Sequence, residues 1–263
     1  MVRVLALTVA LGVVQHYRND LHPANEASRI YAALAIVDHG TVALDPVFDD
    51  IAPGWRGSGR PPNRDVSVFE GSYRLDKAPG VTLLAVPVLG AMRLAGLEPS
   101  FSTLAWLLSL LFSALPAALF AEGLRRRLLA DRMPPAISAG IVLATPWMAY
   151  GGMLFGHSLA AALAGGGMLL ALGPIPVDPE RSGAPGEAPG RDRFRTAVAG
   201  LLLGLAVLTE YPAVVLAILV AASLAVDPAR RRLLPWLALG ALPAVAGLLA
   251  WNQANFEIGR AHV

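Results

Sequence analysis

The sequence lacks cysteine and is poor in charge. With no cysteine among its 263 residues, neither a disulfide framework nor a thiolate metal site or nucleophile is possible. Only 15% of the residues are charged and 55% are hydrophobic, with a mean hydropathy of +0.56, whereas about a quarter of the residues in soluble domains are charged. The composition therefore predicts a membrane protein. The formal net charge is only +2, and we expect no nucleic-acid partner.

The apolar residues gather into separate blocks. A bilayer core of about 30 Å needs about 20 helical residues per crossing, so the shorter blocks must borrow flanking residues or lie buried in a bundle. We therefore expect an all-α fold, a polytopic bundle of about seven transmembrane helices. The blocks span residues 2–15, 102–122, 136–150, 158–173, 197–208, 212–226 and 233–250.

Arginine clusters predict the topology. Glycines at 151–156 and the sequence TEYP at 209–212 interrupt two long apolar stretches, and we interpret both stretches as hairpins. Three arginine clusters then share one face, which the positive-inside rule makes cytoplasmic. We expect a multi-pass protein of the plasma (inner) membrane with a cytoplasmic N-terminus and a long extracytoplasmic first loop at about 16–100. The clusters are Arg125, Arg126, Arg127 and Arg132; Arg181, Arg191, Arg193 and Arg195; and Arg230, Arg231 and Arg232.

This first loop is expected to contain juxtamembrane helices. NEASRIYAALAIVDHG (25–40) predicts an amphipathic helix that Asn25 caps and Gly40 ends. The following stretch, VALDPVFDDIAPGWRGSGRPPNRD, predicts an irregular loop, and Gly71 predicts a turn. The apolar run VTLLAVPVLGAMRLAG (81–96) contains a proline and an arginine, which favours a juxtamembrane or re-entrant helix over another crossing.

At these residues the chain resembles a family. An acidic helix start after the first crossing, followed by DKAPGVTLLAVP (76–87) before an apolar helix, is similar to the GT-C class of glycosyltransferases. The closest resemblance is to the family 39 branch of protein O-mannosyltransferases and lipid A aminoarabinose transferases. The resemblance implies sugar transfer from a polyprenyl-phosphate donor to a glycan, lipid or protein acceptor on the extracytoplasmic face. Those relatives have more helices, so residues 1–256 resemble the N-terminal part of such a domain.

Lys77 is the only lysine among 21 Lys and Arg residues. It lies in EGSYRLDKAPG (70–80), at the boundary between the polar loop and an apolar helix. A compact ammonium there can neutralise the phosphate of a lipid-linked donor as the sugar leaves. The alternative is an ordinary surface pair with Asp76, which contributes about 0–1 kcal/mol.

Glycosyl transfer also needs a carboxylate opposite the departing phosphate. Glu26 is the first catalytic candidate, because it occupies the second place of the family's acidic pair, but Asn25 stands where those relatives have their catalytic acid. The alternative for Glu26 is ordinary stabilisation of a helix N-terminus. Asp65 is the second candidate, with Asp45 behind it; either carboxylate can instead hold a turn.

The remaining substrate-binding candidates each have an ordinary alternative. Arg29 can bind phosphate or pair with Glu26, and Tyr73 can stack on a sugar or anchor the loop. His157, like Glu210 and Tyr211, lies at an outer turn, where a histidine bonded to backbone is the alternative. No cofactor is expected. A divalent metal held by His16, His22, His39 and carboxylates stays open, although no ligand spacing supports it.

Two further expectations concern the whole chain. Residues 257–263, EIGRAHV, can be encoded by a common sequencing-adapter read, so we exclude them from fold reasoning. A lipid-linked sugar flippase or solute transporter remains an alternative, although it would favour paired discontinuous helices over a carboxylate-rich loop. A non-catalytic membrane scaffold is the other alternative, and Asn25 in place of an acid favours it.

Overall fold

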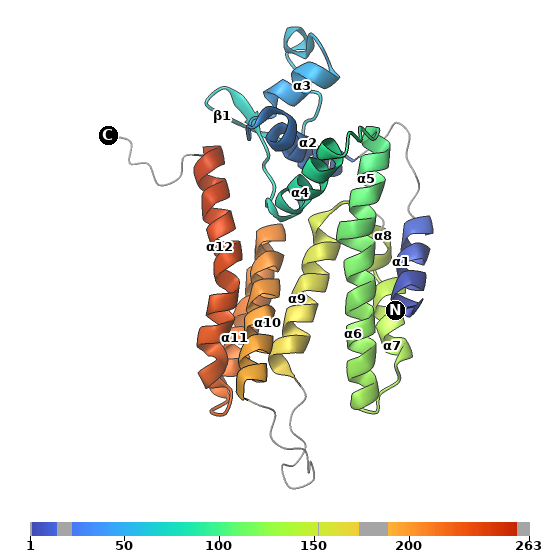
Figure 1. The fold of residues 1–263 in the computed structure, drawn as a ribbon, viewed down its shortest axis with the longest axis vertical. Helices are drawn as coiled ribbons and strands as arrows, with labels where there is room; N and C mark the ends of the chain where they lie inside the picture. Colours follow the sequence, from blue (N-terminus) through green and yellow to red (C-terminus); the bar gives the residue numbers. More distant parts are fainter. Residues whose placement is uncertain (1, 15–22, 152, 174–188, 257–263) are drawn as a thin grey trace, which may run out of the picture.

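The computed structural model describes residues 2–14, 23–151, 153–173 and 189–256 (Figure 1). Predictions for Arg181, for His16 and His22, and for the tail at 257–263 lie outside the described residues. The described part is mostly helical, with one short hairpin, which confirms the all-α class.

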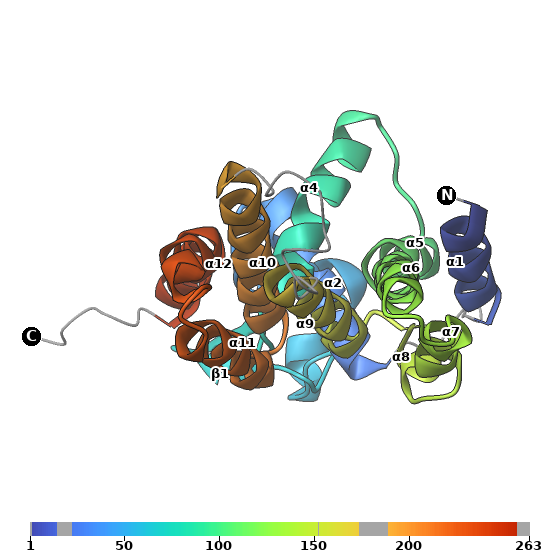
Figure 2. The ribbon, with the colours of Figure 1, turned by 90° about the horizontal axis from the view of Figure 1, so that it is seen from below.

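Helix α1 and the helices after residue 100 form a bundle (Figure 1). Figure 2, which looks along it, shows α9–α12 on one side and α1 with α5–α8 on the other. The helices are α1 (Val2–Val14), α5 (Phe101–Ser109), the π-helical turn η2 (Leu110–Ala114), α6 (Leu115–Ala130), α7 (Ala136–Leu143), α8 (Trp147–Gly151), α9 (Gly156–Leu172), α10 (Pro189–Thr209), the 3₁₀ turn η3 (Tyr211–Ala213), α11 (Val214–Val226), the 3₁₀ turn η4 (Arg231–Leu233) and α12 (Leu234–Phe256).

Two helical segments in the described ranges, 101–130 and 231–256, are long and apolar enough to cross a membrane. Other apolar helices, including α9 and α11, are shorter. The block predicted at 136–150 forms two short helices, α7 and α8, instead of one. By contrast, α10 stops at Thr209 and a new helix follows Tyr211, as the interpretation of TEYP as a turn predicts.

The C-terminal end of α6, the start of α10 and the connection between α11 and α12 carry the described arginines of the three clusters, and all lie at one end of the bundle, which we call the arginine end (Figure 1). Two arginines cap the C-terminus of α9 there: Arg127 donates to the carbonyl oxygen of Gly173, and Arg230 donates to that of Leu172. Since Arg127 lies in α6 and Arg230 lies between α11 and α12, their hydrogen bonds hold these two parts of the bundle to the end of α9. The two hairpins predicted from the sequence require this arrangement.

The parallel helices α10 and α12 approach each other through glycine. A Cβ on Gly200 would overlap the carbonyl oxygen of Leu237, and a Cβ on Gly240 would overlap that of Ala197. Small residues at such positions let helix backbones pack closely. This contact is reciprocal, with one glycine from each helix.

Residues 23–99, which we call the head segment, cover the opposite end of the bundle (Figure 1). Its elements are α2 (Ala24–His39), α3 (Asp45–Ile51), the 3₁₀ turn η1 (Trp55–Ser58), β1 (Ser67–Phe69), β2 (Ser72–Arg74) and α4 (Gly80–Leu94). The strands pair antiparallel with Val68 opposite Tyr73, around the predicted turn at Gly71. The irregular loop predicted for 42–65 is wrong in part, because α3 and η1 form there.

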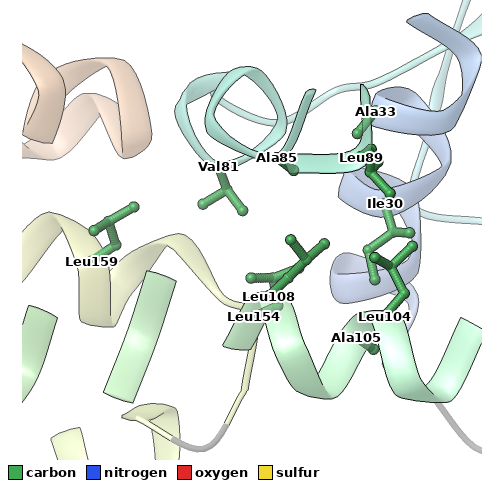
Figure 3. Packing of buried hydrophobic residues seen from close by; sticks show 10 residues of the cluster. All are labelled: Ile30, Ala33, Val81, Ala85, Leu89, Leu104, Ala105, Leu108, Leu154 and Leu159. Carbon is green, nitrogen blue, oxygen red and sulfur yellow. The ribbon is translucent and has the colours of Figure 1, made fainter. Parts of the chain in front are cut away.

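The predicted helix at 25–40 exists as α2, and Gly40 ends it in the left-handed conformation at φ 64°. The predicted cap is wrong: the helix begins at Ala24 after Pro23, and no side chain caps it. Helix α2 packs on α4, and both rest on α5 through a shared core. Figure 3 shows that core, in which Ile30, Val81 and Leu89 meet Leu104 and Leu108.

Candidate functional site

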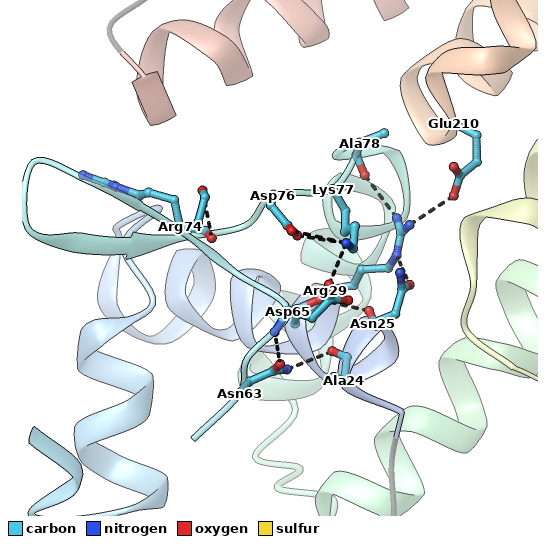
Figure 4. A network of polar contacts seen from close by, with 12 residues as sticks. Ala24, Asn25, Arg29, Asn63, Asp65, Arg74, Asp76, Lys77, Ala78 and Glu210 are labelled. Atoms are coloured by element: carbon cyan, nitrogen blue, oxygen red, sulfur yellow. Dashed lines mark hydrogen bonds and ion pairs between the residues drawn. The ribbon is translucent and has the colours of Figure 1, made fainter. Parts of the chain in front are cut away.

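Lys77 lies between β2 and α4, where the head segment meets the bundle. Its Nζ atom is 2.6 Å from Asp65 Oδ1 and 3.2 Å from Asp76 Oδ1, and a quarter of the side chain is exposed. Asn63 fixes this region by accepting a hydrogen bond from the Asp65 backbone N–H at 2.8 Å, while its Nδ2 donates to the Ala24 carbonyl at 2.8 Å. Figure 4 shows both carboxylates pointing at the ammonium.

The carboxylates keep Lys77 charged. Burial alone would lower the pKa of the ammonium, but the hydrogen bonds to Asp65 and Asp76 outweigh it and raise the pKa above its ordinary value. The structure thus brings three of the predicted site residues into direct contact. The ordinary alternative, a pair with Asp76 alone, omits the shorter contact to Asp65.

Arg29 is buried beside this group, with 2% of the residue exposed. Its guanidinium donates to Asn25 Oδ1, to the Ala78 carbonyl oxygen and to Glu210 Oε1, each at 3.1 Å. Burial lowers the pKa of Arg29, although Glu210 acts in the opposite direction. Asn25, at the position where a catalytic acid was expected from the resemblance, therefore orients a cation.

Glu210 connects the head segment to the bundle. Its Oε1 atom accepts from Arg29 and lies 3.4 Å from His157 Nδ1, so α2, α9 and the α10–η3 turn meet at one carboxylate. Gly156 makes room for it, because a Cβ there would overlap Glu210 Oε1. In the sequence, only the position of Glu210 directly after the helix break at Thr209 indicates a role for it.

Glu26 points elsewhere. The residue is 5% exposed, and its Oε1 accepts from the Leu154 backbone N–H at 3.0 Å and from Ser109 Oγ at 3.3 Å. These contacts direct it toward α5 and the start of α9, whereas Arg29, one turn further along α2, is directed toward Ala78 and Glu210. The two predicted catalytic carboxylates, Glu26 and Asp65, thus have different described partners, with Ser109 and Leu154 at the first and Lys77 at the second.

Tyr73 takes part in an aromatic group with Trp55 and Phe48, at centroid distances of 5.3 Å and 5.9 Å. Its backbone N–H donates to Asp45 Oδ2 at 2.8 Å, so Asp45 holds the hairpin. The ring also lines an open groove of about 410 Å³ with Arg60, Pro61, Arg64 and Val66. These contacts are those of a residue that anchors the loop, while sugar stacking by Tyr73 stays a prediction.

His157 is the most open of the predicted site residues near the network, with 57% of its side chain exposed. Of the other histidines, His39 pairs with Asp50 at 2.9 Å. No group of three or more His, Cys, Asp or Glu side chains that could hold a metal ion is found in the described ranges.

The charges of the network near Lys77 leave one negative charge in excess. Lys77 and Arg29 are cations, while Asp65, Asp76 and Glu210 are carboxylates. A further anion would therefore meet net negative charge here unless a carboxylate moved away from the ammonium.

No family model matches the chain, and neither a curated protein nor a solved structure matches it.

Proposed function

We propose that the chain forms a polytopic membrane glycosyltransferase domain of the GT-C type, which transfers a sugar from a polyprenyl-phosphate donor to a glycan, lipid or protein acceptor. The head segment would lie on the extracytoplasmic face of the plasma membrane and the arginine end in the cytoplasm. The observation that carries the proposal is the ammonium of Lys77 between Asp65 and Asp76, beside buried Arg29, at the boundary between a polar segment and apolar helices.

The surface of α12 supports placement in a bilayer. Its most apolar stretch is only 11% buried, whereas the core helix of a soluble protein is mostly buried, so its exposure favours contact with lipid. Leu249 is 65% exposed, and on the adjacent α11 Ile218 is 61% exposed. Soluble monomers rarely expose contiguous apolar surface of this kind. With α5–α6 as a second long span, the shorter apolar helices would complete a bundle of about seven crossings.

The proposed reaction uses an exchange of partners at Lys77. The donor phosphate takes hydrogen bonds from the ammonium and thereby releases Asp65. The glycosyl–phosphate C–O bond breaks, a new bond forms between the sugar carbon and the acceptor, and Asp65 accepts the proton that the acceptor loses. The polyprenyl phosphate leaves with its charge compensated by Lys77 and Arg29.

Binding tests the proposal most directly. We would measure capture of a polyprenyl-phosphate sugar by the chain in lipid nanodiscs, by native mass spectrometry. Lys77→Ala removes a charge-assisted contact of about 1.5–3 kcal/mol, so we expect at least about tenfold weaker binding. Arg93→Gln is the matched control, because Arg93 pairs with Asp38 at 2.8 Å outside the network. Equal binding of the donor by wild type and Lys77→Ala would contradict the proposed donor site at Lys77.

Transfer of labelled sugar by membranes that contain the chain separates the two carboxylates. We expect Asp65→Asn to bind donor while losing transfer by about 10²-fold or more, the range typical of a lost general base. Glu26→Gln should mainly lower stability, because its carboxylate is buried among hydrogen bonds. Full transfer by Asp65→Asn contradicts its role as base. Movement of the lipid-linked sugar across the bilayer without transfer would favour a flippase instead.

A further inference from the structure

The arginine end contains a small cavity far from the Lys77 network. It has a volume of about 90 Å³ and is lined by Asp192, Arg193, Arg232, Leu233 and Trp236. The Arg193 guanidinium carbon lies 5.6 Å from the centre of the Trp236 ring, a cation–π arrangement that holds the arginine beside the cavity. We call this the Arg193 cavity.

Among the described residues, the lining of the Arg193 cavity carries one more positive than negative side chain. For Arg193 and Arg232 the structure gives no carboxylate partner within the described residues, whereas neighbouring Arg230 pairs with Asp227 at 3.2 Å. Asp192 is the only acid in the lining, against two guanidinium groups. Helices α10 and α12 both begin at this end (Figure 1), and the positive ends of their dipoles add to the attraction for an anion.

An apolar groove begins next to the cavity. Its volume is about 440 Å³, and side chains of α10, α11 and α12 line it, including Leu203, Val207 and Ala217. All of its lining residues are apolar or glycine. The lining includes Leu234, the first residue of α12. It follows Leu233 of the cavity, the last residue of η4, so a cationic cavity and an apolar groove meet at adjacent residues.

We propose that this end of the bundle binds an anionic phospholipid, with its phosphate in the Arg193 cavity and an acyl chain in the groove. Charge complementarity selects the anionic headgroup, and the apolar lining selects a lipid over a free phosphate. The inference rests on the membrane placement proposed above, but it does not depend on glycosyl transfer. Trp236 belongs at such a site, because indole rings favour the interface between headgroups and acyl chains.

The test compares phosphatidylglycerol with phosphatidylcholine of the same acyl chains, added to the purified chain in detergent and counted by native mass spectrometry. Each basic side chain near an anionic headgroup attracts it, and Arg193→Gln/Arg232→Gln removes two of them. We therefore expect the double variant to bind phosphatidylglycerol about 30-fold more weakly. Arg126→Gln/Arg132→Gln is the matched control, since it removes the same charge from the same end outside the cavity. It should change binding less than about threefold.

Further arms keep the proposal testable if the double variant folds poorly. Arg193→Lys keeps the charge but loses the planar stack on Trp236, and we expect an intermediate loss. Val245→Trp, at a half-exposed groove position, should weaken binding without changing the arginines. Equal binding of the two lipids, or an equal loss in the control double variant, would overturn the proposal. Displacement of the lipid by millimolar inorganic phosphate would also overturn it, because that result assigns the cavity to a free anion.

Discussion

In the head segment, Gly40, Gly54 and Gly71 have positive φ angles and nothing within 4 Å of the place where a Cβ would lie. In the bundle, Gly200 and Gly240 have helical backbones, and a Cβ on either would strike the backbone of the neighbouring helix. The first set supplies backbone conformations that side chains disfavour, whereas the second supplies space. At these five positions glycine therefore marks turns in the head segment and a close helix contact in the bundle.

Charge differs between the regions in the same way. The head segment places ion pairs where its elements meet, as at Arg93 with Asp38 and at Arg29 with Glu210. The bundle has arginines at its end and apolar contacts along its length. Electrostatic changes should therefore affect the head segment and its attachment, and changes of volume should affect the bundle.

The largest effect should come from Arg29→Met. It leaves Glu210 without its guanidinium partner, and removing one member of a buried pair costs about 3–5 kcal/mol. Thermal unfolding in detergent, followed by tryptophan fluorescence, measures the loss. Arg29→Met/Glu210→Gln should recover part of the stability, because no unpaired charge remains. If the double variant lost more stability than the two single variants lose together, this account of the attachment would be contradicted.

Next comes Gly240→Ala in the bundle. The added methyl must push the backbone of α10 away at Ala197, and overpacking of this kind costs about 1–3 kcal/mol. Gly140→Ala in α7 is the matched control, because nothing lies within 4 Å of its Cβ position, and it should be neutral or slightly stabilising. Equal unfolding temperatures for both variants would show that α10 and α12 are not in close contact.

Lys77→Met should have a smaller effect on stability than on ligand binding. The pair with Asp65 is partly exposed, and we expect a loss of about 1 kcal/mol or less at neutral pH. Because the folded-state pKa of Lys77 is raised above 10.5, its contribution is present below that pH and is lost as pH rises through the folded pKa. The unfolding temperatures of variant and wild type should therefore converge in alkali, and a constant difference would contradict the ion pair.

Asp38→Asn should have the smallest effect. The hydrogen bond from Arg93 lowers the pKa of Asp38 below its ordinary value of 3.8, so its contribution is present above that pH and is lost as pH falls through the folded pKa. We expect about 0.2–1 kcal/mol at pH 7 for this partly exposed pair. The difference from wild type should vanish in acid. Glu70→Gln, at an exposed turn position outside this ion pair, is the control and should leave the unfolding temperature at pH 7 unchanged.

Much of the fold follows from local sequence patterns. The apolar blocks locate the helices after residue 100, and the break at TEYP and the end of α2 at Gly40 are where the sequence predicts them. The apolar block at 136–150 predicts one continuous helix, whereas Pro146 lies between two short helices there. At 45–58 the sequence predicts an irregular loop, but α3 forms there because Val47 and Phe48 are buried. Tertiary burial, which composition does not encode, explains that second error.

The site was only partly predictable. Lys77, Asp65 and Asp76 lie close together in sequence, and their contact follows from a short hairpin. Glu210 pairs with Arg29 across 181 positions, and no local pattern indicates such a partner. The opposite directions of Glu26 and Arg29 were also out of reach, because they depend on which side of α2 meets α5 and which meets the 77–80 turn.

The π-helical turn at Leu110–Ala114 shifts which residues of the helical segment 101–130 lie on the same face of that segment. Ser109, before it, bonds to the head segment at Glu26, while Ser113 donates to the Met153 carbonyl. A π-turn accommodates one extra residue relative to regular α-helical winding. A relative without it would be one residue shorter here, so an ungapped alignment through this hydrophobic stretch would mismatch every position on one side of the turn.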